Sequence, residues 1–243
     1  KDVVLHIGAA SSMVNVWVNE QFVGYSEDSK TPAEFNIDQF LKEGENSLAI
    51  EIFRWCDGSY LEDQDFWRMS GITRDIYLLA RAEQQVQDFR VISGLDDTYT
   101  NGVFSLNVEV LNMGETAGNT VAEAVLNDGD NAVQTFSQPV AAGKTSVVFE
   151  ANIPDVKQWS AEIPNLYELI ITLKNGENVV EVIRQDVGFR TSEIKNGNLL
   201  INGKYVYLKG ANIHEHHEKT GHYVEMETRS EEHTSELQSR HNL

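Results

Sequence analysis

The sequence predicts a mainly β protein, and three observations lead to that prediction. Apolar and polar residues alternate along most of the first two hundred residues, and a period of two is typical of strands with one buried face. Turn-forming pairs such as Asp57-Gly58 and Asn175-Gly176 separate the alternating runs. No long stretch has the 3.6-residue apolar period of an amphipathic helix.

The first block, residues 1–83, begins with Lys1–His6, which reads as if the chain starts inside a strand. Valines alternate with other residues over Val14–Val18, and aliphatic residues alternate over Leu48–Ile52. Each run predicts a strand with one apolar face. Between them, Asp38–Lys42 predicts a single helical turn.

The second block, residues 84–191, shows the same alternation over Phe104–Val110 and further strand-like runs at Val147–Phe149 and Leu169–Leu173. Asn175-Gly176 joins two such runs, which is a strong hairpin signal. Several short strands within about a hundred residues are typical of an immunoglobulin-like sandwich. The Cys…Trp…Cys pattern of antibody domains is absent, so we expect a sandwich without a disulfide.

The third block, residues 192–228, opens with a second hairpin signal. Leu199–Ile201 and Tyr205–Leu208 are strand-like runs on either side of Asn202-Gly203. We expect the second of these strands to run into Gly210. A cluster of histidines follows it at once, between positions 214 and 222.

Composition excludes some classes of partner. The chain of 243 residues has 19 Lys and Arg against 38 Asp and Glu, a formal net charge of −19. An acidic surface repels nucleic acid and anionic lipid, so we expect neither a nucleic-acid nor a membrane partner. The single cysteine, Cys56, cannot form an internal disulfide, which favours a reducing, cytoplasmic location. No apolar run is long enough to predict a transmembrane helix.

The last fifteen residues, Arg229–Leu243, are polar and lack a strand period. They resemble the translation of a sequencing-library adapter. We therefore expect the natural sequence to end near Thr228 and 229–243 to be a non-native tail; the alternative is a disordered polar tail.

Five segments carry a family resemblance. They are Gly24–Lys30, Ala33–Phe35, Trp55–Asp75, Trp159–Tyr167 and Val187–Arg190, and the opening of the histidine cluster continues the series. In this order they resemble glycoside hydrolase family 2, and within it the large bacterial β-galactosidases. The density of matches in Trp55–Asp75 is what favours that group over the β-glucuronidases and β-mannosidases.

The resemblance implies three domains. Residues 1–83 resemble the later, C-terminal part of a jelly-roll sugar-binding domain, and residues 84–191 the immunoglobulin-like domain. Residues 192–228 resemble the first strands of a (β/α)₈, or TIM, barrel, but they supply only 37 of the roughly 250 residues that a barrel needs. We therefore expect a fragment with a truncated barrel.

The resemblance also implies a function: retaining hydrolysis of terminal β-D-galactosides such as lactose, by an enzyme that is a homo-oligomer at full length. A retaining glycosidase needs two carboxylates, which in this family are glutamates on later barrel strands. Glu215 and Glu218 do not match that pair. No residue of this chain is therefore expected to be catalytic, and the chain alone should be inactive.

Four residues match binding positions of the family. His214 matches a histidine that contacts sugar hydroxyls, and Asp65 matches an aspartate that contacts the galactosyl group and helps to hold Na⁺. Asp57 and Glu27 match positions that bind Mg²⁺ in some members, although Glu27 stands where a glutamine is expected. Carboxylates suit both hydroxyl groups and hard cations.

Some alternatives remain open at this point. His216 and His217 have weaker claims as sugar contacts than His214. Trp55, Phe66 and Trp67 either stack on sugar faces or pack between domains. The whole chain is alternatively a non-catalytic carbohydrate-binding fragment. Least favoured is a zinc hydrolase that uses His214 and His216 as an H-x-H pair.

Overall fold

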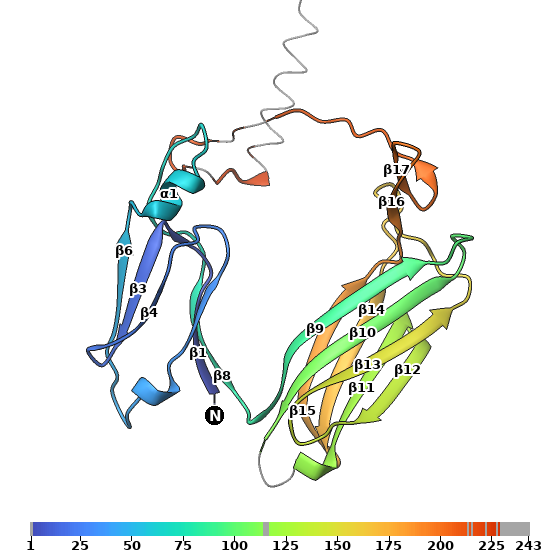
Figure 1. The fold of residues 1–243 in the computed structure, drawn as a ribbon, viewed down its shortest axis with the longest axis horizontal. Helices are drawn as coiled ribbons and strands as arrows, with labels where there is room; N and C mark the ends of the chain where they lie inside the picture. The colour runs from blue at the N-terminus through green and yellow to red at the C-terminus, as the bar shows by residue number, and fades with distance from the viewer. Residues whose placement is uncertain are drawn as a thin grey trace, which may run out of the picture. The chain divides into compact units, whose positions relative to one another are not determined.

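The computed structural model describes residues 2–113, 117–212, 214, 216–221, 223–226 and 228, and the secondary structure of these residues is mainly β (Figure 1). This confirms the predicted fold class. The expected non-native tail, 229–243, lies outside the described residues. Within the described part, no helix has the length and apolar character needed to cross a bilayer.

The first block contains eight short strands, one 3₁₀ turn and one short helix. These are β1 (Asp2–Ile7), β2 (Ala10–Ser11), β3 (Met13–Val18), β4 (Gln21–Ser26), β5 (Ala33–Asn36), η1 (Asp38–Phe40), β6 (Leu48–Phe53), α1 (Asp57–Leu61), β7 (Gly71–Ile72) and β8 (Ile76–Arg81). The strands form sheets of order β5-β1-β8 and β4-β3-β6, and β2 pairs with β7.

Alternation in β1 and β3 builds the core of this block. Leu5 and Ile7 of β1 and Val14, Val16 and Val18 of β3 are buried in one apolar cluster. Burying each of these side chains contributes about 1.5–3 kcal/mol. The predicted strands and helical turn of this block are therefore confirmed.

The second block is a seven-stranded sandwich. Its elements are β9 (Gln84–Leu95), β10 (Gly102–Asn112), η2 (Ala117–Asn119), β11 (Thr120–Asp128), β12 (Asn131–Pro139), β13 (Gly143–Ile153), β14 (Tyr167–Asn175) and β15 (Asn178–Val187). One sheet has the order β13-β10-β9 and the other β12-β11-β14-β15. Alternate apolar residues of β10, from Phe104 to Val110, and of β14, from Tyr167 to Leu173, are buried in a single core. This arrangement confirms the predicted immunoglobulin-like sandwich.

A tyrosine ties the loop before β14 to this sandwich. Tyr167 is the first residue of β14 and is buried. Its hydroxyl accepts a hydrogen bond of 2.8 Å from the backbone N–H of Lys157. Its ring packs edge-on against Phe189, with 5.2 Å between centroids. A tyrosine bonded in this way at the start of the sixth strand is a recurrent feature of immunoglobulin-like sandwiches, and sequence analysis did not identify it.

The third block is a small antiparallel sheet of β16 (Ser192–Lys195), β17 (Asn198–Ile201) and β18 (Lys204–Tyr205). Asn202 and Gly203 both have positive φ, 51° and 72°, as a two-residue type I′ hairpin turn requires. The second predicted hairpin is therefore confirmed. The expected strand Tyr205–Leu208 is wrong beyond Tyr205, where β18 ends. The Val206 N–H still donates to the Leu199 carbonyl at 3.1 Å, but no strand of the described residues pairs with Tyr207 or Leu208.

The described chain divides into two compact units. The first contains residues 1–63 and 69–207. The second joins the five residues Gln64–Arg68 to the segment that begins at Leu208. A short insertion from the first block thus belongs to the same compact unit as the histidine cluster.

Candidate functional site

The insertion Gln64–Arg68 follows directly from a well-anchored helix. The Cys56 N–H donates to Ser59 Oγ at 2.7 Å at the start of α1, and Glu62 N–H donates to the Gly58 carbonyl at 2.9 Å at its end. Glu62 then accepts a 2.9 Å hydrogen bond from the Ser29 N–H. These hydrogen bonds hold the chain in place as far as Glu62, two residues before the insertion begins.

Within the insertion, the backbone turns tightly and presents Asp65. The Phe66 N–H donates to the Gln64 carbonyl at 2.7 Å, which closes a turn around Asp65. The Asp65 side chain is exposed. Its carboxylate is therefore available to hydroxyl groups or to a cation.

The histidine cluster is held by a turn of its own. His217 and Gly221 exchange backbone hydrogen bonds of 2.8 and 3.0 Å, and His217 Nδ1 lies 2.9 Å from the Thr220 hydroxyl. The ring of His217 is therefore engaged in shaping the turn. His214 and His216 are exposed, whereas Glu215 and His222 lie outside the described residues.

Two aromatic–histidine contacts join the insertion to the histidine cluster. The Phe66 ring lies 5.3 Å from the His214 ring, and the Trp67 ring lies 5.2 Å from the His216 ring, edge to face. Phe66 and Trp67 are themselves nearly parallel, with 6.2 Å between centroids and 8° between planes. Two consecutive aromatic residues thus contact two histidines that are two positions apart in the sequence. We call these contacts the aromatic–histidine joint.

The joint bears on the two hypotheses for Phe66 and Trp67. Phe66 and Trp67 pack on histidines rather than standing free as a platform for sugar, although Trp67 remains 53% exposed. Because Asp65 precedes Phe66, the joint brings the segment that carries Asp65 to His214. These are the two residues that the family resemblance assigns to sugar binding.

The two residues expected to bind Mg²⁺ lie in the other unit, on adjoining segments. A Cβ placed on Gly58 would come within 2.8 Å of the Glu27 carbonyl oxygen, so the start of α1, with Asp57, lies against the segment of Glu27. Their carboxylate oxygens suit Mg²⁺. The described residues contain no group of three or more His, Cys, Asp or Glu side chains that could hold a metal ion.

A neighbouring aspartate shapes the loop after Glu27. Asp28 accepts hydrogen bonds from the Thr31 hydroxyl and from the N–H groups of Lys30 (2.8 Å) and Thr31 (3.0 Å). These bonds, that of the Thr31 hydroxyl first, lower the pKa of Asp28 to about 2. Asp28 is therefore charged at neutral pH and is occupied in holding the loop.

Comparison with known proteins agrees with the fold. Three family models match consecutive parts of the chain: the sugar-binding domain of glycosyl hydrolases family 2 on residues 1–82, the glycosyl hydrolases family 2 model on 84–190, and the TIM barrel domain of that family on 192–242. Together they cover almost all of the sequence. The chain belongs to glycosyl hydrolase family 2.

Among curated relatives, a β-galactosidase of Priestia megaterium (strain DSM 319 / IMG 1521) is 44% identical over 219 residues, which cover 88% of this chain and 21% of the relative. A β-galactosidase of Enterobacter cloacae is 39% identical over 228 residues, which cover 90% of this chain and 22% of the relative. The chain thus spans about a fifth of the length of these relatives.

Among solved structures, the β-glucuronidase of Bacteroides uniformis superposes with a TM-score of 0.82 at 22% identity. The match covers 96% of this chain and 29% of that one. At this identity the likeness shows the shared fold alone.

Proposed function

We propose that the protein containing this chain is a retaining β-galactosidase that hydrolyses terminal β-D-galactosides such as lactose. The observation that carries the proposal is the aromatic–histidine joint, in which Phe66, next to Asp65, packs on His214. The two relatives named β-galactosidase, at 44% and 39% identity, support galactosides over other substrates of the family.

In this proposal Asp65 and His214 recognise the sugar. A carboxylate accepts hydrogen bonds from two sugar hydroxyl groups at once, and an imidazole either donates or accepts one. Hydroxyl contacts of this kind strengthen as the sugar distorts towards the transition state. Their role is to position the galactosyl group and not to break the bond.

The bond-breaking carboxylates are proposed to lie outside this chain. A retaining mechanism needs an acid/base and a nucleophile about 5–5.5 Å apart. The isolated chain is therefore expected to give no turnover of a chromogenic β-galactoside. Turnover that follows the folded chain through purification would overturn this assignment.

Two cations belong to the proposal. Asp65 is proposed to contribute to Na⁺ binding, and Asp57 with Glu27 to Mg²⁺ binding; when bound, each cation would neutralise carboxylate charge. The adjoining segments of Asp57 and Glu27 support the second assignment. We also propose that the full-length protein is a homo-oligomer and is cytoplasmic; the lone Cys56 supports the latter.

Galactose titration of the ¹⁵N-labelled chain tests the sugar site directly. We expect saturable shifts in the insertion and the histidine cluster, and at least a fivefold loss of affinity in Asp65→Asn, because a charged acceptor is replaced by a neutral one. Glu218→Gln is the matched control, since it removes another exposed carboxylate near the histidines. Equal losses in both variants would show that charge alone matters and would refute a specific role for Asp65.

A second candidate function is non-catalytic carbohydrate binding, which is favoured by the sugar-binding domain model that matches residues 1–82. It predicts galactose-dependent shifts in the first block, with the insertion unaffected. A family 2 glycosidase of other specificity, such as a β-glucuronidase or β-mannosidase, is the third. Parallel titrations with galactose, glucuronate and mannose distinguish these specificities.

A further inference from the structure

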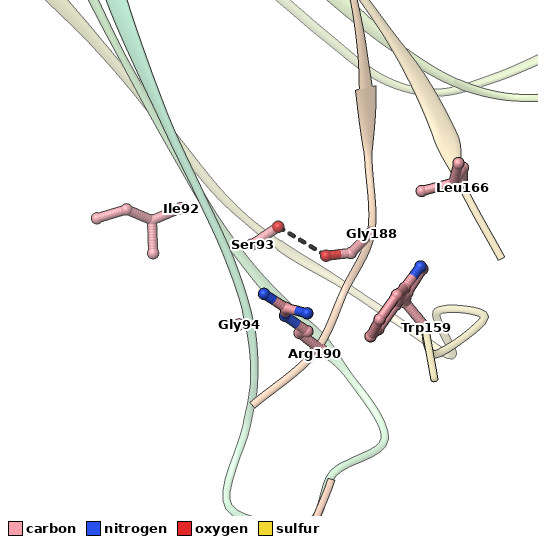
Figure 2. A pocket seen from close by; sticks show the side chains of 7 residues that line it. All are labelled: Ile92, Ser93, Gly94, Trp159, Leu166, Gly188 and Arg190. Carbon is pink, nitrogen blue, oxygen red and sulfur yellow. Dashed lines mark hydrogen bonds between the residues drawn. The ribbon is translucent and has the colours of Figure 1, made fainter. Parts of the chain in front are cut away.

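A hollow of about 440 Å³ lies at one end of the immunoglobulin-like sandwich, and the proposed function does not use it (Figure 2). It joins two of the sequence segments that carried the family resemblance, Trp159–Tyr167 and Val187–Arg190. Trp159 and Leu166 come from the first segment, and Gly188 and Arg190 from the second. Strand β9 completes the lining with Ile92, Ser93 and Gly94.

Backbone hydrogen bonds fix the walls of this hollow. The Trp159 N–H donates to the Phe189 carbonyl at 2.9 Å, and the Arg190 N–H donates to the Ser93 carbonyl at 3.1 Å. The Ser93 hydroxyl donates to the Gly188 carbonyl at 2.9 Å (Figure 2). A Cβ on Gly188 would lie 3.0 Å from the Trp159 side chain, so any residue larger than glycine would press on the indole. The hollow is therefore formed in advance of any ligand.

The hollow carries a cation, Arg190, that no acid among the described residues neutralises. The Arg190 guanidinium carbon lies 4.8 Å from the centroid of the Trp159 ring, and no carboxylate of the described residues forms an ion pair with Arg190. This is unexpected in a chain with 38 acidic and 19 basic residues. A guanidinium with one face on an aromatic ring keeps its in-plane N–H groups for a carboxylate.

Two aliphatic side chains line the same hollow. Ile92 and Leu166 line the hollow and are 51% and 50% exposed. A second hollow of about 300 Å³ shares Ser93 and Gly188 with the first and is lined by Phe89 and Val91. Small-molecule sites of 300–1,000 Å³ typically combine apolar walls with a few fixed polar groups.

We propose that this hollow binds a small organic monocarboxylate with an apolar body. The carboxylate lies at the edge of the Arg190 guanidinium, and the apolar body packs on Ile92 and Leu166. The second hollow accepts a longer apolar tail. Asp186 lines that second hollow, and its charge disfavours a ligand with a second carboxylate.

Phenylacetate and its neutral isostere phenylacetamide test the proposal on the ¹⁵N-labelled 243-residue chain. We expect phenylacetate to shift the amides of Gly94 and Gly188 and the Trp159 indole N–H in a saturable way. Because the guanidinium is exposed, we expect phenylacetamide to bind about fivefold more weakly. Equal affinities, or shifts that avoid these three groups, would overturn the proposal.

Two variants test whether the charge of Arg190 causes the preference for phenylacetate. Arg190→Gln should abolish the preference for phenylacetate over phenylacetamide. Lys174→Gln is the matched control, because Lys174 is a cation of the same sandwich that pairs with Glu123 and lines neither hollow, and it should keep the preference. A preference that survives Arg190→Gln, or one lost in Lys174→Gln, contradicts the assignment. The two probes on the unaltered chain decide the proposal even if Arg190→Gln fails to fold.

Discussion

The aromatic–histidine joint makes a quantitative prediction about sugar binding. Trp67→Ala removes the edge-to-face contact with His216 at 5.2 Å. Such pairs contribute about 0.5–1.5 kcal/mol; because the Trp67 side chain is 53% exposed, we expect the lower half of that range. If the joint holds Asp65 beside His214, galactose should bind about two- to fivefold more weakly to the variant.

A double-mutant cycle with Trp67→Ala and His216→Ala, read by galactose titration, isolates the contact. We expect the double variant to lose less affinity than the two single losses combined, with a coupling of about 0.5–1 kcal/mol. Trp55→Ala is the matched control, because Trp55 is similarly exposed, at 49%, but lies in the other compact unit.

Three results would refute this reasoning. Strict additivity of Trp67→Ala and His216→Ala would show that their contact does not act on the sugar site. An equal loss of affinity in Trp55→Ala would show that removing any exposed tryptophan has the same effect. Unchanged binding in Trp67→Ala, with the fold intact, would leave the joint without a positioning role.

Three further predictions concern stability. Tyr167→Phe leaves the backbone N–H of Lys157 without its acceptor. We expect the free energy of unfolding, measured in urea, to fall by about 1–3 kcal/mol. An unchanged value would contradict the role of Tyr167 in tying this loop to the sandwich. Gly203→Ala should destabilise the hairpin turn between β17 and β18. Gly203 has φ +72°, and a Cβ there would lie 2.5 Å from the Tyr99 ring. An unchanged thermal midpoint of unfolding would contradict this strain. The turn held by Asp28, whose pKa is lowered from 3.8 to about 2, should be stable above pH 4 and open as pH falls through 2. Thr31 amide shifts in a pH titration measure this opening, and Thr31→Val should raise the pKa of Asp28.

Much of the fold was predictable because its signals are local. The alternation in Phe104–Val110 places every second side chain of β10 in one core, and a period of two needs no knowledge of the partner strand. Asn202-Gly203 predicted its hairpin because positive φ at two successive residues strongly favours these two residue types. The predicted strand Tyr205–Leu208 failed beyond Tyr205 because strand residues need a hydrogen-bonded neighbour that sequence alone does not supply.

The tyrosine of the sandwich had a signal that sequence analysis did not use. Tyr167 follows Pro164-Asn165, a turn pair, and stands two residues before the strand-like run Leu169–Leu173. A tyrosine at the start of that strand is typical of immunoglobulin-like sandwiches. The sequence could not show which group the Tyr167 hydroxyl bonds. Its donor, the Lys157 N–H, lies in the loop before the strand.

The sequence by itself determined the class of fold, the order of its blocks and the family, because alternation, turn residues and motif order are properties of neighbouring residues. It also singled out Asp65 and His214 as candidates. Only the tertiary structure decided that Phe66 and Trp67 pack on His214 and His216, and that Trp159 lies against Arg190. Contacts between residues far apart in the chain depend on how strands and loops close in space, and no local pattern encodes that closure.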